Sequence, residues 1–148
     1  MMKISTKGRY GLRLMLDLAL YINEGPIFLK DIAKRQDISE KYLGHLIPPL
    51  KVANLINSSR GAHGGYMLNK SPSEITLGEV IRALEGNHCI SECVITPEIC
   101  SRSSICITRD IWSEVSEKMM DVMESITLQN MLQRHKEKLK SQPIMYNI

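Results

Sequence analysis

The chain has few aromatic residues and no long apolar run. It contains a single Trp and a single Phe, which leaves little material for stacking the bases of a single strand. The longest apolar stretch, LRLMLDLALYI, is interrupted by Asp17 and is too short to span a bilayer. The basic N-terminus lacks the apolar centre of a secretory signal. The sequence therefore predicts a cytoplasmic protein with no membrane partner.

Catalytic signatures are also absent. The sequence shows no Ser-His-Asp order, no glycine loop of the phosphate-binding kind and no H-E-x-x-H helix. The histidines do not form a ligand spacing; they are His45, His63, His88 and His135. An enzyme is not expected. The net charge of +3 is compatible with a nucleic-acid partner but does not identify one.

Apolar periodicity predicts a mainly α-helical chain with one small β-hairpin. Helices are expected over 6–23, 29–36, from 40 onward, 77–86, 108–125 and 128–140, and strands over 54–59 and 66–69. Ser39, Thr76 and Thr127 are placed to cap helices. Pro48 and Pro49 lie about two turns inside the third helix and predict a kink or a restart there.

Two short helices joined by a tight turn and followed by a hairpin are typical of a winged helix-turn-helix. In such a fold the N-terminal turn of the second short helix reaches base edges in the major groove. The candidates here are Ser39, Glu40, Lys41, Tyr42 and, one turn on, His45. Lys30, Lys34, Arg35 and Lys51 are expected near phosphates. Each of these charges could also be an ordinary solvated side chain.

The predicted hairpin loop, SSRGAHGGY, carries Arg60 and His63 on a glycine-rich turn. An arginine on such a turn can enter a minor groove, where the potential is negative. Arg60 and His63 therefore complete the predicted DNA-binding set.

All four cysteines fall within residues 88–112, spaced Cys89-x3-Cys93-x6-Cys100-x5-Cys106. Zinc knuckles need closer pairs, and only Cys89 and Cys93 approach that spacing. The wider spacing of the four cysteines favours a loop wrapped around a larger inorganic core, since thiolates are the usual ligands of iron–sulfur clusters. A zinc ion, buried free thiols, and a disulfide switch through Cys89/Cys93 or Cys100/Cys106 remain alternatives.

Three stretches resemble the IscR/NsrR/CymR family of bacterial winged-helix regulators: ISTKGRYGLRLMLDLAL, DIAKRQDISEKYLGHLIPPL and RGAHGGYMLNKSPSEITLGEVIRALEG. The resemblance covers nearly the whole chain, to about residue 132. It implies a homodimer that binds a palindromic operator in double-stranded DNA. It also implies that Ser39, Tyr42 and their neighbours enter the major groove and Arg60 the minor groove.

The cluster-binding branch of that family has three cysteines before its long dimer helix, and Cys93, Cys100 and Cys106 match them. The resemblance thus implies an iron–sulfur cluster, with 2Fe-2S favoured over 4Fe-4S. Relatives complete the site with a His three residues after the last cysteine, or with an Asp from the first helix of the other subunit. Arg109 and Arg9 hold those positions here, and neither can ligate iron.

The fourth ligand is therefore open. Cys89 is the natural substitute, His88 or Glu98 could compete, and an open coordination position is a further alternative.

We expect four parts: a winged helix-turn-helix domain over 1–86, a cluster loop over 87–107, a dimerisation helix and terminal helix over 108–140, and a tail over 141–148. The apolar face of the 108–125 helix exceeds what one small domain can cover, which favours a twofold dimer. The predicted function is transcription regulation under control of the cluster. The alternative is a cluster-free regulator of cysteine or sulfur metabolism that acts through thiol oxidation or a sulfur-metabolism enzyme partner.

Overall fold

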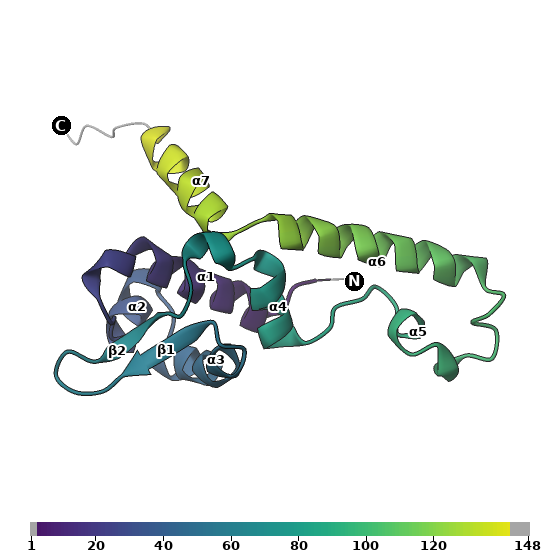
Figure 1. Cartoon of the computed structure of the whole chain (residues 1–148), viewed down its shortest axis with the longest axis horizontal. Helices are drawn as coiled ribbons and strands as arrows, with labels where there is room; N and C mark the ends of the chain where they lie inside the picture. The colour runs from purple at the N-terminus through teal and green to yellow at the C-terminus, as the bar shows by residue number, and fades with distance from the viewer. Residues whose placement is uncertain (1–2, 143–148) are drawn as a thin grey trace.

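Helices and one antiparallel hairpin make up the computed structural model, which describes residues 3–142 (Figure 1). The elements are α1 (Thr6–Leu20), α2 (Leu29–Gln36), α3 (Glu40–Val52), β1 (Ile56–Ser59), β2 (Gly65–Leu68), α4 (Leu77–Glu85), α5 (Glu92–Ile95), α6 (Ile107–Ser125) and α7 (Leu128–Lys140). Short 3-10 turns cover Ile22–Glu24, Pro72–Glu74 and Pro97–Ile99. The predicted mainly helical class with a β-hairpin wing is confirmed. Most of the expected tail, residues 143–148, lies outside the described residues.

The predicted helix caps are present. The Ser39 hydroxyl accepts the Tyr42 amide at 3.1 Å and starts α3. Thr76 and Glu79 form a reciprocal capping box at α4. Thr127 caps α7 in the same way. These caps satisfy amide groups that a helix N-terminus leaves without partners.

The two prolines do not interrupt α3, which runs unbroken from Glu40 to Val52. The predicted restart is therefore wrong. Pro48 and Pro49 remove the amide partners of the Gly44 and His45 carbonyls. Gly44 is half-buried and His45 is exposed, so water can take the place of the missing donors.

α1 lies at the centre of a compact winged body (Figure 1). Its buried residues Leu14, Met15 and Leu18 join a core shared with α3, α4 and α7. The approach of α4 is close, because a Cβ on Gly11 would lie 2.0 Å from a methyl carbon of Leu84. α7 returns to this body after α6, and its Leu128 is fully buried there.

The hairpin is anchored through β2 to the segment before α2, close to its loop. β1 pairs with β2 in the register Ile56↔Leu68 to Ser59↔Gly65. Ile27 and Tyr66 then exchange backbone hydrogen bonds of 2.9 and 2.8 Å. Gly65 has a φ of +136°, and a Cβ there would lie 2.4 Å from the Ile27 carbonyl oxygen, so only glycine fits.

α5, the cysteine segment and α6 form an arm that projects from the winged body (Figure 1). The base of the arm is fixed where Glu124 of α6 pairs with Arg82 and accepts the Thr76 hydroxyl at 2.9 Å. No helix within residues 3–142 is long and apolar enough to cross a membrane.

Candidate nucleic-acid interface and cysteine segment

The helix-turn-helix is held in place by a buried carboxylate of α1. Asp17 is 1% exposed and accepts hydrogen bonds from both ends of the Arg35 guanidinium, at 2.6 and 3.0 Å. Gln36 donates a third at 2.9 Å. This hydrogen bonding raises the pKa of Arg35 above its usual value. Arg35, expected near phosphates, instead ties α2 to α1 and so sets the position of α3.

The first turn of α3 presents the predicted base-reading residues at the surface. Ser39, Glu40, Lys41 and His45 are exposed, and Tyr42 is half-buried. Ser39 also caps α3, but its hydroxyl hydrogen is still available to a partner because the cap uses the oxygen as acceptor. The structure thus brings the five residues together on one end of α3.

An aromatic pair extends this surface onto α1. The Tyr10 and Tyr42 rings meet edge to face, with centroids 5.6 Å apart. The guanidinium groups of Arg9 and Arg13 lie 5.8 and 5.5 Å from the Tyr10 ring centroid. Sequence reasoning did not assign Tyr10 or Arg13 to the interface. The Arg-Tyr-x-x-Arg spacing is the signal that could have suggested them, since residues three apart are neighbours on a helix.

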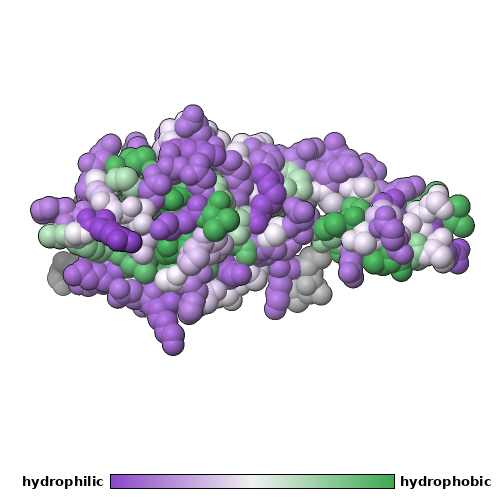
Figure 2. Space-filling model, turned by 60° about the horizontal axis from the view of Figure 1, so that its bottom comes forward, coloured by the Kyte–Doolittle hydropathy of each residue, from purple (hydrophilic) through white to green (hydrophobic). Residues whose placement is uncertain are grey.

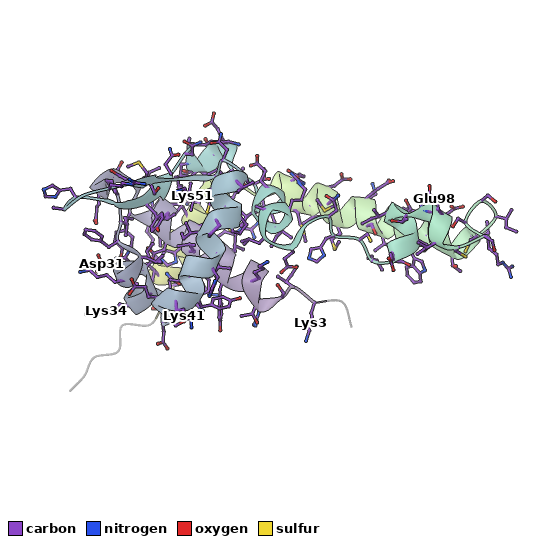
Figure 3. The ribbon with its side chains drawn as sticks, turned by 90° about the horizontal axis from the view of Figure 1, so that it is seen from below. Lys3, Asp31, Lys34, Lys41, Lys51 and Glu98 are labelled. Carbon is purple, nitrogen blue, oxygen red and sulfur yellow. The ribbon has the colours of Figure 1, made fainter. Side chains whose placement is uncertain are left out.

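The wing carries Arg60 and His63 exposed on its loop, separate from the first turn of α3. Figure 3 shows Lys41 and Lys51 toward opposite ends of α3, with Lys34 beside the Lys41 end. Lys51 donates to the Ser58 hydroxyl at 2.8 Å, which joins the end of α3 to β1. Lysines therefore lie at both ends of α3, Lys41 beside its first turn and Lys51 beside the wing.

The cysteine segment is more ordered than its sequence indicated, since it contains α5 and the Pro97–Ile99 turn. At its start, the Ile90 amide donates to the Ser116 hydroxyl of α6 at 3.2 Å. The Cys89 thiol donates to the Ser91 carbonyl at 3.0 Å. Further along, the Cys93 carbonyl accepts from Arg109 Nε at 2.8 Å. The segment therefore runs beside α6, attached to it at two points.

Cys106 is the N-cap residue of α6. Its sulfur lies 3.2 Å from the Thr108 hydroxyl oxygen. That hydroxyl and the amides at the start of the helix lower the pKa of the Cys106 thiol below its usual value. Cys100 is exposed on the turn before it, and all four thiols are free of disulfides.

Within residues 3–142, no three His, Cys, Asp or Glu side chains are gathered closely enough to hold a metal ion. Cys89 instead borders a hollow of about 670 Å³ against α6, together with Lys3, Ile4, His88, Ile90, Met119 and Met123. Metal ligation by the predicted cysteines stays a prediction.

Glu85 joins the start of the cysteine segment to the N-terminus of α1. Its carboxylate accepts the Ser5 amide at 2.9 Å and the Gly8 amide at 3.1 Å, and also the Ser5 hydroxyl. The His88 ring donates to its other oxygen. Burial alone would raise the pKa of Glu85, but the hydrogen bonds from Ser5 and His88 outweigh it and lower that pKa. Sequence reasoning missed this residue.

Comparison with known proteins gives concordant matches. Residues 4–134 match the Rrf2 family model, described as an iron-dependent transcriptional regulator. The protein rrf2 of Nitratidesulfovibrio vulgaris is 42% identical over 131 residues, which is 88% of this chain and 87% of that protein. The structure of T. potens IscR matches with a TM-score of 0.78 and 41% identity over 98% of this chain and 96% of the other. The structure of CymR, the global cysteine regulator of B. subtilis, matches with a TM-score of 0.75 and 42% identity. The match covers 88% of this chain and 96% of the CymR chain.

Proposed function

The chain belongs to the Rrf2 family of transcriptional regulators, and we propose that it binds operator DNA as a homodimer whose affinity is set by an iron–sulfur cluster. The family consists of DNA-binding regulators and not enzymes, as the sequence predicted. The operator geometry, the cluster and the coupling between them are our proposal.

The exposed first turn of α3 is the observation that carries the DNA-binding part. A recognition helix presents its N-terminal residues to base edges in the major groove. Ser39, Glu40, Lys41, Tyr42 and His45 take that role here, and Arg60 and His63 reach the adjacent minor groove from the wing. Tyr10 and Arg13 continue the surface along α1, where a phosphate would meet a guanidinium held over an aromatic ring.

The uncovered apolar face of α6 supports the dimer. Ile111, Val115 and Val122 are 48%, 43% and 58% exposed. Their spacing of four and seven residues places them on one side of the helix. A second copy of α6 would cover this face in a twofold arrangement. Two recognition helices would then read half-sites about 34 Å apart.

The chemistry of the donor set fits an iron–sulfur cluster. Cys93, Cys100 and Cys106 lie on a short segment, carry no disulfide, and include one thiol of lowered pKa, which favours the thiolate that a metal requires. For the fourth position the sequence offers Cys89, with His88 and Glu98 as competitors. When bound, the cluster supplies a redox-sensitive and acid-labile link between the thiolates.

The segment that would hold the cluster connects α4 to α6. Its first end is attached to α4 and α1 through the Glu85–His88 pair, and its second end is the cap of α6. When this segment is ordered, it would fix the orientation of each winged body relative to the two paired α6 helices of the dimer. A coupling of about 1–3 kcal/mol would change operator affinity roughly 5- to 150-fold.

The test is operator binding with and without the cluster. An operator is first selected from randomised duplex DNA under anaerobic conditions, and its affinity is then measured for protein reconstituted with iron and sulfide and for metal-free protein. We expect a difference of at least about fivefold. Arg60→Ala should weaken both forms, and Arg134→Ala on α7 serves as its control. Equal affinities for the two forms would contradict cluster control while leaving DNA binding intact.

A cluster-free regulator that acts through thiol oxidation is the second candidate. The lowered pKa of Cys106 and the match to the B. subtilis cysteine regulator favour it. This candidate predicts colourless protein after anaerobic reconstitution, with operator affinity that changes on oxidation and is restored by a thiol reductant. Visible absorption together with bound iron and sulfide would instead support the cluster.

A further inference from the structure

We infer that Tyr10 of α1 is a positioning residue for Tyr42, and that Arg13 holds Tyr10 in place for that task. The inference deepens the proposed function and rests on it, because it takes Tyr42 as one of the residues that read base edges. It leaves the phosphate contact at this surface to Arg9. The specificity of the recognition helix is then set in part by a neighbouring helix.

The backbone and the ring of Tyr42 are held by different parts of the chain. The Tyr42 amide donates to the Ser39 hydroxyl at 3.1 Å, which fixes the start of α3. That bond does not determine the side-chain torsions of Tyr42. Tyr42 is half-buried, and its ring meets the Tyr10 ring edge to face, with 87° between the ring planes. Tyr10 therefore provides a contact from outside α3 that favours one direction of the Tyr42 ring.

Tyr10 is itself held by an anchored cation. The Arg13 guanidinium lies 5.5 Å from the Tyr10 ring centroid, within the range of a cation–π contact. Arg13 Nε donates to the side-chain oxygen of Gln36 at 3.2 Å, and Arg13 Nη2 donates to the Gln36 carbonyl. Gln36 in turn donates to Asp17, which is 1% exposed. The Arg13 guanidinium is thus fixed to the end of α2 and, through it, to a buried carboxylate.

Helical spacing brings these groups together. Tyr10, Arg13 and Asp17 are three and four residues apart, so they lie along one side of α1. Gln36 is the last residue of α2, and Tyr42 lies in the first turn of α3. The contacts therefore join α1 to both helices of the helix-turn-helix. A ring direction that is fixed before DNA arrives reduces the ordering that binding must supply.

Arg9 is the matched contrast to Arg13. Its guanidinium lies 5.8 Å from the same Tyr10 ring centroid, close to the 5.5 Å of Arg13. Arg9 donates to the Thr6 hydroxyl of its own helix, in a long hydrogen bond of 3.4 Å. A guanidinium has several N–H donors, so this bond leaves others for a phosphate. The two arginines therefore share one ring, but Arg13 is tied to a second helix and Arg9 is bonded within α1.

The experiment separates positioning from phosphate binding. The affinity of the full chain, after one common anaerobic reconstitution, is measured for the selected operator and for each of its single-base-pair variants at several salt concentrations. The protein variants are Tyr42→Ala, Tyr10→Leu, Tyr10→Phe, Arg13→Lys and Arg9→Gln, with Arg134→Gln on α7 as the control. The base pair of each half-site at which Tyr42→Ala loses most discrimination defines the Tyr42 position.

We expect Tyr10→Leu and Arg13→Lys to lower discrimination at the Tyr42 position roughly two- to tenfold, the range typical of an aromatic pair. Discrimination at other positions and the dependence of affinity on salt should match wild type, because neither change removes a phosphate contact. Tyr10→Phe should recover most of the loss, since it keeps the ring. Arg13→Lys isolates the anchor, because lysine keeps the charge but cannot form the same fork.

Arg9→Gln should behave differently. It should weaken binding to all sequences about equally and reduce the salt slope by about one per chain, as expected for a lost phosphate contact. Arg134→Gln should match wild type in both measurements.

Wild-type discrimination at the Tyr42 position in either Tyr10→Leu or Arg13→Lys would overturn the inference. A uniform loss with a lower salt slope in Tyr10→Leu would also overturn it, because Tyr10 would then contact phosphate. Circular dichroism checks that each protein is folded; Arg13 is exposed, so Arg13→Lys decides the question even where Tyr10→Leu is unstable. A Tyr42→Ala protein with wild-type discrimination at every base pair would instead refute base reading by Tyr42 in the proposed function.

Discussion

The winged body and the arm differ in how their apolar side chains are used. In the body, Leu14, Met15 and Leu43 are fully buried. In the arm, Ile105 and Ile107 are 73% and 72% exposed, and Figure 2 shows apolar patches gathered at that end of the molecule. One chain therefore completes the body by itself but leaves the arm uncovered. We interpret the arm as the part whose order depends on a second copy and on a bound metal.

Polar contacts follow the same division. Among the described residues, no buried side-chain polar atom lacks a hydrogen-bond partner. In the body these partners come from distant parts of the chain, as with Asp17 and Arg35. In the arm, the hydrogen bonds of the Cys89, Cys93 and Cys106 thiols go to groups two residues away. The thiols themselves therefore do not fasten the segment, which is joined to α6 by the Ile90–Ser116 and Arg109–Cys93 bonds.

The sharpest contrast is expected between two apolar truncations. Leu14→Ala removes a fully buried side chain and should lower the free energy of unfolding by about 2–5 kcal/mol. Val122→Ala, 58% exposed on α6, should change it by less than about 0.5 kcal/mol once dimerisation is accounted for. Urea unfolding at several protein concentrations measures both. Equal losses would show that the arm is as tightly packed within one chain as the body.

Removal of the buried carboxylate should be the next largest effect. Asp17→Ala leaves Arg35 and Gln36 without their shared acceptor. Because the Arg35 side chain is 32% exposed and can recover water, we expect a loss of about 2–3 kcal/mol, below that of a fully buried pair. Operator affinity should fall as well, since α2 positions α3. Glu24→Ala, at an exposed site, is the control, and a stable Asp17→Ala protein would argue against this clamp.

A charge on the uncovered face of α6 should affect assembly and leave the body intact. Val115→Asp would bury a carboxylate in the proposed dimer interface and weaken dimerisation by about 2–3 kcal/mol. Sedimentation velocity would show a shift toward monomer while circular dichroism keeps its helical signal. Glu117→Ala, on the other side of α6, should leave the dimer unchanged. An unaffected dimer in Val115→Asp would place the interface elsewhere.

The smallest effect concerns the joint between body and arm. The lowered pKa of Glu85 means that its ionised form stabilises the fold above the unfolded value of 4.5, and that this contribution is lost as pH falls through the lower folded pKa. Glu85→Gln should therefore cost about 1 kcal/mol at pH 7, and its difference from wild type should shrink below pH 4.5. Unfolding curves from pH 7 to pH 3 test this. A difference that stays constant with pH would contradict it.

Local features were the ones that the sequence predicted well. Ser39, Thr76 and Thr127 cap their helices because a cap depends on residues within one turn. The hairpin and the helix-turn-helix follow from turn residues and apolar spacing in the same way. The sequence also places all four thiols in one short segment, and their ligation of a metal stays a prediction.

Features that join distant residues were missed. The Asp17–Arg35 clamp and the Glu85–Ser5 contact span 18 and 80 residues, and no local pattern marks them. For the same reason Arg35 was expected at phosphates. The attachment of Ile90 to Ser116 was missed as well, because it depends on how the segment folds back along α6.

Metal control of the arm is tested most directly by amide hydrogen exchange, followed by mass spectrometry, on the protein with and without reconstituted iron and sulfide. We expect peptides from residues 87–106 to gain strong protection when the metal binds, and peptides from α1 and α3 to exchange slowly in both states. Unchanged exchange over residues 87–106, in protein shown to contain iron and sulfide, would contradict the claim that the metal orders the arm.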